Sequence, residues 1–397
     1  NIANTNPLYS SVIKAAQQAG YPFTEDANGF MQEGFCAFDL TIKDGKRCGT
    51  GKAYMQEVYK RKNIDIFLKS QDQKIIIENK TAKGIELLID DQKEEIFAGR
   101  EVIVSCGSIN SPHLLMLSGI GNASELQKLN IEVNHNLPGV GKNLQDHLEI
   151  YTQFKCTQPV SLYSLFNNPL VQIYEGILWF LFKKGKLSHT HLEAGGFVRS
   201  SNDYDYPNLQ FHFFPSLVIN HGLGKPDCHA FQFHASPNRP TSRGWIKLRS
   251  SNPTDYPIIQ FNYLETEEDR KQMRDSVRIS RKIFSQDAFK PYLGEEISPG
   301  IDKQSDEDLD EVIRNKADTA YHPSCTNKMG VDQMSVVDSE TKVYGIENLR
   351  VVDSSIMPNI ISGNINAATL MIAEKASDLI LGKQEAEPID VEYYQAI

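Results

Sequence analysis

Residues 102–117, VIVSCGSINSPHLLML, join a short apolar run to a glycine turn and an apolar helical pattern. The run at the start is typical of a buried strand. Ser111 suits the N-cap of the helix, Pro112 suits its first position, and Gly119 ends it. A strand, a glycine turn and a helix in this order bring a backbone close to a phosphate-bearing cofactor. The stretch therefore predicts an α/β domain, although such turns occur in many proteins of that class.

Two later stretches also indicate an α/β domain. They are residues 321–330 (YHPSCTNKMG) and residues 351–369 (VVDSSIMPNIISGNINAAT). Each places a polar side chain in a turn-forming neighbourhood, His322 in the first and Asn364 in the second. The second stretch leads into an apolar helix expected over residues 365–380. We expect His322 and Asn364 to converge on one reacting atom.

The remaining elements predict a second type of domain in the middle of the chain. Strands expected in this region alternate apolar and polar residues, as in a sheet that buries one face and is more often antiparallel. Over the whole chain, and beyond the elements already named, the expected helices lie at residues 7–20, 170–182, 265–284 and 301–317. The expected strands lie at residues 64–68, 74–77, 84–89, 209–213, 231–233, 246–248 and 258–261, with a hairpin tip at residues 90–95.

The bulk composition limits the classes of function. A chain of 397 residues forms one large domain or two to three ordinary ones. The net charge of −10 and the lack of a basic patch disfavour nucleic acid as a partner. No run of about 18 apolar residues occurs, so no membrane span is expected.

Cysteine and glycosylation signals are weak. None of the six cysteines forms a CxxC pair, so no metal site is expected, and their disulfide pairing cannot be read from spacing. Sequons at Asn79 and Asn122 permit a secreted location, the leading hypothesis, without establishing it.

Four stretches together resemble the glucose–methanol–choline (GMC) family of FAD-dependent oxidoreductases: GSINSPHLLMLSGIG (residues 107–121), LPGVGKNLQDH (137–147), YHPSCTNKMG (321–330) and NLRVVDSSIMPNIISGNINAATLMIAEKASDLI (348–380). They follow the family order over nearly the whole chain, and RCGTGKAYM (47–55) is a looser match. Within the family the chain looks most similar to animal, arthropod-type glucose dehydrogenases. The resemblance implies a mixed α/β (α+β) fold, with a Rossmann-like FAD-binding domain and a substrate domain containing an antiparallel sheet.

One part of the family pattern has no counterpart here. The family begins with a βαβ unit that carries G-x-G-x-x-G for the ADP half of FAD, and no stretch fits it. We therefore expect a fragment that lacks the N-terminal FAD-binding segment and holds FAD weakly. The expected domains are residues 1–60 (substrate-side segment between domains), 61–150 (part of the FAD-binding domain), 151–319 (substrate domain), 320–384 (C-terminal part of the FAD-binding domain, with the catalytic residues) and 385–397 (tail).

The resemblance assigns roles to two catalytic residues. His322, in the HPxxT segment, is the expected base, and histidine suits that role near neutral pH. Asn364 would donate a hydrogen bond to the same substrate oxygen and stabilise a developing alkoxide. The N-terminus of the following helix, with Asn366 in its first turn, would face the negative charge of the reduced flavin.

The resemblance also assigns the cofactor-binding residues. Asp353 and Ser354 would meet the ribityl or pyrophosphate part of FAD, with Gly107 and Ser108 as their counterparts on the earlier strand. Asp72 stands where the family contacts adenine through its backbone. An acidic side chain is unexpected there, as is Cys325 where a glycine or another small residue is common.

The implied function is FAD-dependent oxidation of an alcohol, such as glucose or another sugar, with electrons passed to a quinone-type acceptor or to oxygen. Two alternatives stay open, a catalytically silent binding scaffold and a lyase on the same scaffold. His147 is interpreted as structural. The histidines of the alternating region are interpreted as pocket or core residues, namely His212, His221, His229 and His234.

Overall fold

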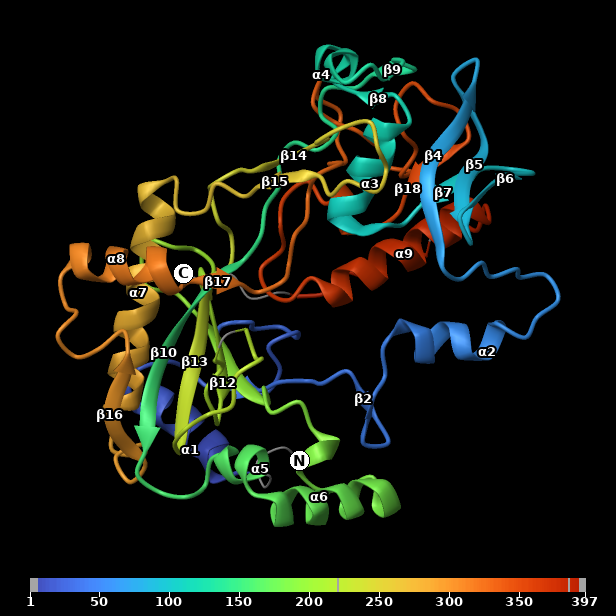
Figure 1. Ribbon diagram of the computed structural model, residues 1–397. Helices are drawn as coiled ribbons and strands as arrows, with labels where there is room; N and C mark the ends of the chain where they lie inside the picture. Colours follow the sequence, from blue (N-terminus) through green and yellow to red (C-terminus); the bar gives the residue numbers. More distant parts are fainter. Residues whose placement is uncertain (1–5, 220, 385, 393–397) are drawn as a thin grey trace.

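The computed structural model describes residues 6–219, 221–384 and 386–392. Two bodies of structure lie side by side, one built on a large antiparallel sheet and the other on shorter sheets around helix α3 (Figure 1). Each body has its own large apolar core. The predicted fold class, mixed α/β with an antiparallel sheet, is confirmed. The predicted tail is described only at residues 386–392, and its other residues lie outside the described part.

The large sheet forms the first body. Its strand order is β1-β11-β12-β13-β10-β16, with β17 paired to the start of β10, and all its pairings are antiparallel. The strands are β1 (Gly34–Ala37), β10 (Leu148–Cys156), β11 (Ala194–Val198), β12 (Leu209–Phe214), β13 (Ala230–Pro237), β16 (Leu293–Ser298) and β17 (Asp318–Thr319).

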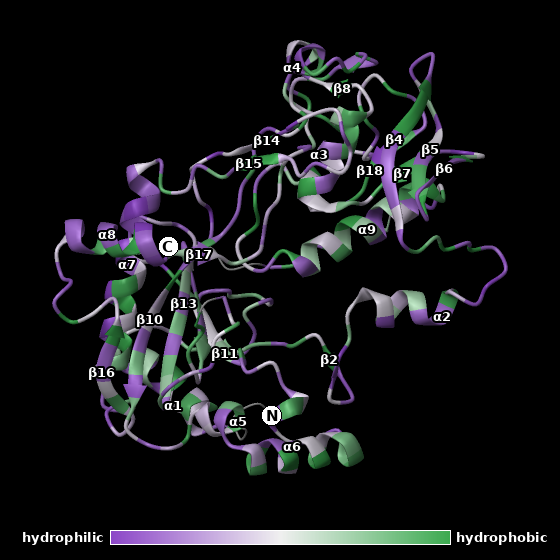
Figure 2. Cartoon of the chain, viewed as in Figure 1, coloured by the Kyte–Doolittle hydropathy of each residue, from purple (hydrophilic) through white to green (hydrophobic). Residues whose placement is uncertain are grey.

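Side-chain alternation gives the two faces of this sheet different chemistry, visible as alternating colours along β10 and β13 (Figure 2). Phe211, Phe213, Phe231 and Phe233 point into the apolar core, where α1 (Pro7–Gln18) and α7 (Glu267–Phe284) pack. The residues between them bring histidine and glutamine to the opposite face. The sheet therefore separates an aromatic core from a polar surface.

In the second body, β7 (Val102–Val104) pairs in parallel with β18 (Leu349–Val351). Helix α3 (Gly107–Leu117) follows the first of these strands, and 3-10 helix η4 (Ser354–Ile356) follows the second. Around them lie β4 (Ser70–Glu78), β5 (Thr81–Ile89), β6 (Gln92–Phe97), β8 (Ile120–Gly121), α4 (Ala123–Lys128), β9 (His135–Asn136), β14 (Trp245–Lys247), β15 (Ile258–Gln260) and α9 (Asn366–Ile380).

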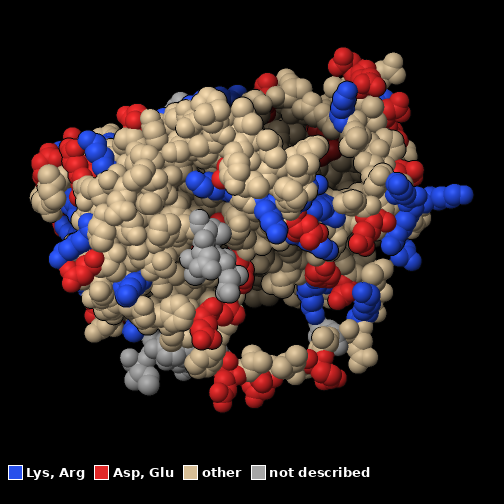
Figure 3. Space-filling model, turned by 90° about the horizontal axis from the view of Figure 1, so that it is seen from below, with Lys and Arg blue, Asp and Glu red and all other residues tan. Residues whose placement is uncertain are grey.

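Smaller elements connect and flank the two bodies. They are β2 (Ile42–Lys43), β3 (Lys46–Arg47), η2 (Gly51–Met55), α2 (Gln56–Val58), α5 (Tyr163–Asn167), α6 (Pro169–Phe182), η3 (Lys186–Ser188) and α8 (Asp306–Lys316). Seen from below, the molecule is hollowed, and charged side chains of both signs gather mainly towards its margins (Figure 3). In the described part of the chain, no helix has the length and apolar character needed to cross a membrane. The six cysteines are all free thiols.

Several local predictions were wrong. Residues 64–68 form no strand. The expected hairpin tip is mostly strand β6, and the turn itself is Asp90-Asp91, where positive φ angles allow a tight reversal. Among the strands of the described residues, β14 and β15 pair with each other and not with the large sheet.

Helix α3 begins at Gly107, so Ser111 is not its N-cap and Pro112 lies inside it. A proline in a helix leaves the carbonyl four residues earlier without its usual donor. Here that carbonyl belongs to Ser108, and it accepts a 2.7 Å hydrogen bond from Thr326 Oγ1. The tertiary contact lets the helix start one turn earlier than the local pattern predicts.

Truncation of Phe213 tests the aromatic core. Phe213 is fully buried and contacts the rings of its neighbours at centroid distances of 5.8–6.3 Å. Phe213→Ala should lower the free energy of unfolding by about 3–5 kcal/mol, measured by urea denaturation. The control Phe97→Ala, at a side chain that is mostly exposed, should change it by less than about 0.5 kcal/mol. Equal losses would contradict this account of the core.

Candidate active site

Backbone pairing brings the segment before β10 against the loop that carries His322. Gln145 N donates to Ser324 O at 3.1 Å, and Ser324 N donates back to Gln145 O at 2.9 Å. Ala320 N donates to His147 O at 2.8 Å. The pairing sets His147 beside His322, with their Nδ1 atoms 3.0 Å apart.

A second pairing joins the His322 loop to the end of β18. Cys325 N donates to Ser354 O at 3.1 Å, and Asn327 N donates to Ser355 O at 2.8 Å. The chain then runs through a turn to Asn364, just before α9. Asn364 Nδ2 lies 3.3 Å from His322 Nε2, so the two residues predicted to converge do lie together.

The polar face of the large sheet supports Asn364 from the other side. Gln210 Nε2 donates to Asn364 Oδ1 at 3.0 Å, and His212 Nε2 lies 3.2 Å from the same oxygen. Burial lowers the pKa of His212 to about 4, so this imidazole is neutral at physiological pH. The Asn364 amide is thereby held with its oxygen towards the sheet and its nitrogen towards His322.

Glu149, on β10, places a buried carboxylate in the same polar surface. Its Oε1 lies 3.1 Å from His234 Nδ1, and it also interacts with the Tyr151 hydroxyl. Burial raises the pKa of Glu149, but the neighbouring His234 and His212 lower it by more, so the net shift is downward. The carboxylate is therefore ionised at neutral pH. Among the described residues, its ion-pair partner is His234 rather than a lysine or arginine.

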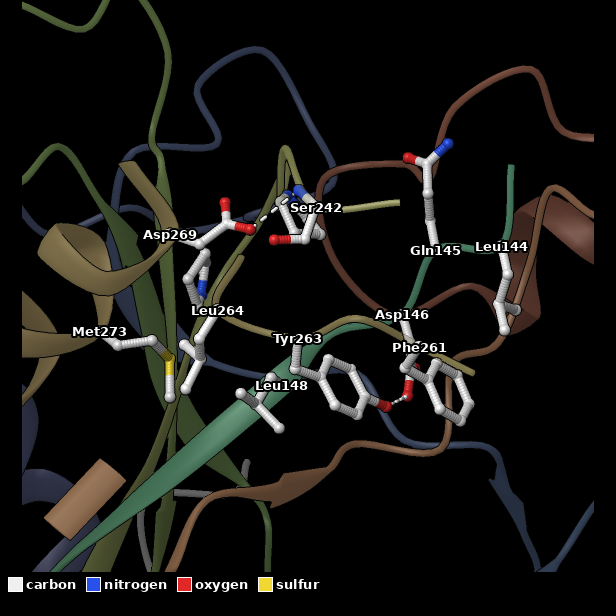
Figure 4. A pocket seen from close by; sticks show the side chains of 12 residues that line it. Leu144, Gln145, Asp146, Leu148, Ser242, Phe261, Tyr263, Leu264, Asp269 and Met273 are labelled. Carbon is white, nitrogen blue, oxygen red and sulfur yellow. Dashed lines mark hydrogen bonds between the residues drawn. The ribbon is translucent and has the colours of Figure 1, made fainter. Parts of the chain in front are cut away.

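The Asp146 carboxylate is hydrogen-bonded to the backbone of the His322 loop, and Asp146 lines a small cavity (Figure 4). Its Oδ1 accepts a 2.8 Å hydrogen bond from His322 N, and its Oδ2 accepts from the hydroxyls of Tyr263 and Thr319, both at 2.5 Å. Burial raises the pKa of Asp146, against the opposing effect of these hydrogen bonds. The three donors fix the carboxylate and, through it, the position of His322.

Four predicted cofactor-binding residues form one cluster where β7 and β18 end. Gly107 N donates to Asp353 Oδ2 at 2.9 Å, and the hydroxyls of Ser108 and Ser354 lie 2.8 Å apart. Asp72 lies nearby, with its Oδ2 3.5 Å from Cys106 Sγ.

Asn366 opens helix α9 on the exposed side, two residues beyond Asn364. Cys325 is fully buried with Met357 and Ile360, and burial raises the pKa of its thiol to about 12. Its φ of 75° lies in the left-handed region, which accounts for glycine being common at this position.

The cluster at Gly107 fits a phosphate-bearing cofactor such as FAD. Gly107 has a φ of 80°, and a Cβ added there would meet open space rather than protein atoms. The start of α3 thus presents backbone N–H groups beside an accessible glycine, which suits the phosphate or ribityl part of the cofactor. Among the residues described, no group of three or more His, Cys, Asp or Glu is arranged to hold a metal ion.

The strand–glycine–helix cluster and the histidine–asparagine pair are the features expected of a flavin-dependent oxidoreductase. Two family models, both described as GMC oxidoreductase, match residues 1–149 and 240–373. The chain belongs to the GMC oxidoreductase family, as the motifs predicted, and FAD is the cofactor of that family.

Relatives with curated names refine this placement. The chain is 50% identical to "Choline dehydrogenase, mitochondrial" of Mus musculus over 98% of its own length, and it spans 66% of that protein. It is 48% identical to "Oxygen-dependent choline dehydrogenase" of Pseudomonas fluorescens, covering 99% of this chain and 70% of that one. The solved structure of pyridoxine 4-oxidase from "Mesorbium loti" superposes with a TM-score of 0.83 at 27% identity, covering 96% of this chain and 70% of that one.

Two predictions need correction. The placement among glucose dehydrogenases is wrong, because these strongly similar relatives are choline dehydrogenases. The prediction that the chain lacks the N-terminal family segment is not supported either, because the family's N-terminal model matches from residue 1.

Sequence reasoning missed the contributions of His147, Asp146 and Glu149 to this site. A signal was present in the spacing of His147, Glu149 and Tyr151, because residues two apart in an extended chain face the same side, but no strand was predicted here. The partner of each side chain lies on a distant segment, and this part of the arrangement required the structure.

Replacing the Asp146 carboxylate tests its role under the His322 loop. Asp146→Asn puts an amide nitrogen where an oxygen accepts hydrogen bonds, so at least one buried donor loses its acceptor. The free energy of unfolding should fall by about 1–3 kcal/mol in urea denaturation. Asp332→Asn, an exposed change further along the chain, should have a much smaller effect. A stability for Asp146→Asn equal to that of the unchanged protein would show that these bonds contribute nothing.

Proposed function

We propose that the protein oxidises an amino alcohol with a quaternary ammonium group, such as choline, with FAD as cofactor and a quinone-type acceptor or oxygen as the final electron acceptor. The observation that carries this proposal is the buried, ionised Glu149 on the same polar surface as His322 and Asn364. The names of the relatives support it.

A cationic head group suits the surroundings of Glu149. A buried carboxylate needs an opposite charge nearby, and its described ion-pair partner is a histidine, which is charged only when protonated. The Tyr151 ring, whose centroid lies 4.5 Å from that of the His234 ring, places an aromatic side chain beside the carboxylate as well. A carboxylate and an aromatic face are the groups that recognise quaternary ammonium ions. A neutral sugar would bring no positive charge to this carboxylate.

His322 and Asn364 suit the oxidation step. Burial lowers the pKa of His322, although the nearby Glu149 opposes the shift, so the imidazole is neutral and able to take the hydroxyl proton. Asn364 Nδ2 can donate to the developing alkoxide without changing its own charge. FAD, when bound, supplies the acceptor for the hydride that leaves the alcohol carbon. The chain's own residues thus bind the cation, remove the proton and stabilise the oxygen.

Removal of the His322 imidazole tests the proposed base. In FAD-loaded protein, His322→Ala should slow flavin reduction by choline at least about a hundredfold, the usual scale for a general base. Stopped-flow absorbance of the flavin measures the rate. His229→Gln, at the histidine directly before the first residue of β13, should leave the rate close to that of the unchanged protein. An unchanged rate for His322→Ala would refute the assignment.

Neutralising Glu149 tests the charge of the substrate. Glu149→Gln should lower kcat/KM for choline at least about tenfold, equivalent to about 1.4 kcal/mol. For dimethylbutanol, in which carbon replaces the ammonium nitrogen, the same substitution should have little effect. Glu295→Gln, at an exposed glutamate, is the matched control. An equal loss with both alcohols would show that Glu149 does not recognise a cation.

A further inference from the structure

His147 is buried and hydrogen-bonded through both of its ring nitrogens. Nε2 lies 3.0 Å from the backbone oxygen of Asn238, and Nδ1 lies 3.0 Å from His322 Nδ1. A carbonyl oxygen can only accept a hydrogen bond, so Nε2 of His147 must carry a hydrogen. The first contact therefore decides which nitrogen of His147 is the donor.

The second nitrogen of His147 is consequently an acceptor. Burial, reinforced by the adjacent His322, lowers the pKa of His147 to about 4, so the ring carries one proton at neutral pH. With that proton on Nε2, Nδ1 has a free lone pair. His322 can hydrogen-bond to this lone pair only by donating from its own Nδ1.

The contacts on the far side of His322 lead independently to the same assignment. Gln210 Nε2 donates to Asn364 Oδ1, which turns the Asn364 amide nitrogen towards His322 Nε2 at 3.3 Å. An amide nitrogen can only donate, so His322 Nε2 presents a lone pair. Both neighbours thus require a hydrogen on Nδ1 of His322 and none on Nε2.

We propose that His147 is a positioning residue that fixes the tautomer of His322, so that the lone pair on Nε2 faces the substrate side of the site. The proposal deepens the proposed function and rests on His322 acting as the base. His147 need not touch the substrate. It acts through His322, as the second hydrogen bond of an imidazole commonly does.

The proton transfer balances on this arrangement. The alcohol O–H bond breaks, and a new N–H bond forms at His322 Nε2. His322 then carries a proton on each nitrogen, and its Nδ1–H remains bonded to the lone pair of His147. Without that acceptor, a buried N–H would lose its partner, and the other tautomer, which cannot accept the alcohol proton at Nε2, would become competitive.

Two substitutions at His147 separate the acceptor from the rest of the side chain. Asparagine places its amide near the position of Nδ1 and can accept from His322. Glutamine places its amide near Nε2, where it can donate to Asn238 O but does not supply the acceptor. Both variants therefore keep a polar side chain at position 147. They differ in which of the two hydrogen bonds of His147 they can form. His229→Gln serves as the control, because that ring is bonded at Nδ1 to Ser161 Oγ, away from the site.

The first measurement is the ¹⁵N chemical shift of the His322 ring in FAD-loaded protein, which distinguishes the two neutral tautomers without substrate. The unchanged protein and His147→Asn should show hydrogen on Nδ1, and His147→Gln should show a mixture or hydrogen on Nε2. The second is the rate of flavin reduction by choline, expected to fall at least about tenfold in His147→Gln and by clearly less in His147→Asn. KM, flavin content and reoxidation of the reduced flavin should change little in either variant.

Hydrogen on Nε2 of His322 in the unchanged protein would overturn the proposal. Equal loss of rate in the two variants would also overturn it, because a purely structural role predicts no rescue by asparagine. If the unchanged protein fails to reduce its flavin with choline, the proposed function fails instead, and the nitrogen shifts still decide the tautomer.

Discussion

The candidate active site depends on the short antiparallel pairing between residues 145–148 and residues 319–324. This pairing joins the start of the large sheet to a loop that belongs to the other body. It places His147 opposite His322 and brings Asp146 under the His322 backbone. Because the loop is also bonded to the end of β18, the two bodies meet at the proposed base. The base is therefore positioned by backbone pairing, which the Asp146 carboxylate reinforces.

The large sheet supplies the polar half of the site as a consequence of side-chain alternation. Along β12 and β13, every second residue faces the apolar core, most of them phenylalanines, and the residues between include Gln210, His212 and His234. Polar groups buried in this way are stable only when each has a partner. Here Glu149 pairs with His234, and His212, which lies opposite His234 on the neighbouring strand, contacts Asn364. The same strands thus stabilise the body and orient the amide beside the base.

Much of this arrangement could be predicted from the sequence. The two motifs that carry His322 and Asn364, and the strand–glycine–helix at Gly107, gave the family, the cofactor and the pair of residues that lie together. The start of α3 could not be predicted, because Ser108 O is satisfied by Thr326, which is far away in the sequence. The proposed substrate class was missed for a similar reason. Glu149 is an ordinary polar residue of an alternating strand until its burial and its partners are known.

The charge of Glu149 links substrate recognition to the state of the base. The carboxylate raises the pKa of His322, against the larger lowering by burial. A cation bound beside Glu149 would cancel part of that field, since opposite charges in a poorly solvated site strongly offset each other. His322 would then become easier to keep neutral at the moment when its lone pair is needed. A neutral alcohol would leave the field of the carboxylate unchanged. The same buried charge would therefore both bind the head group and influence the pKa of His322.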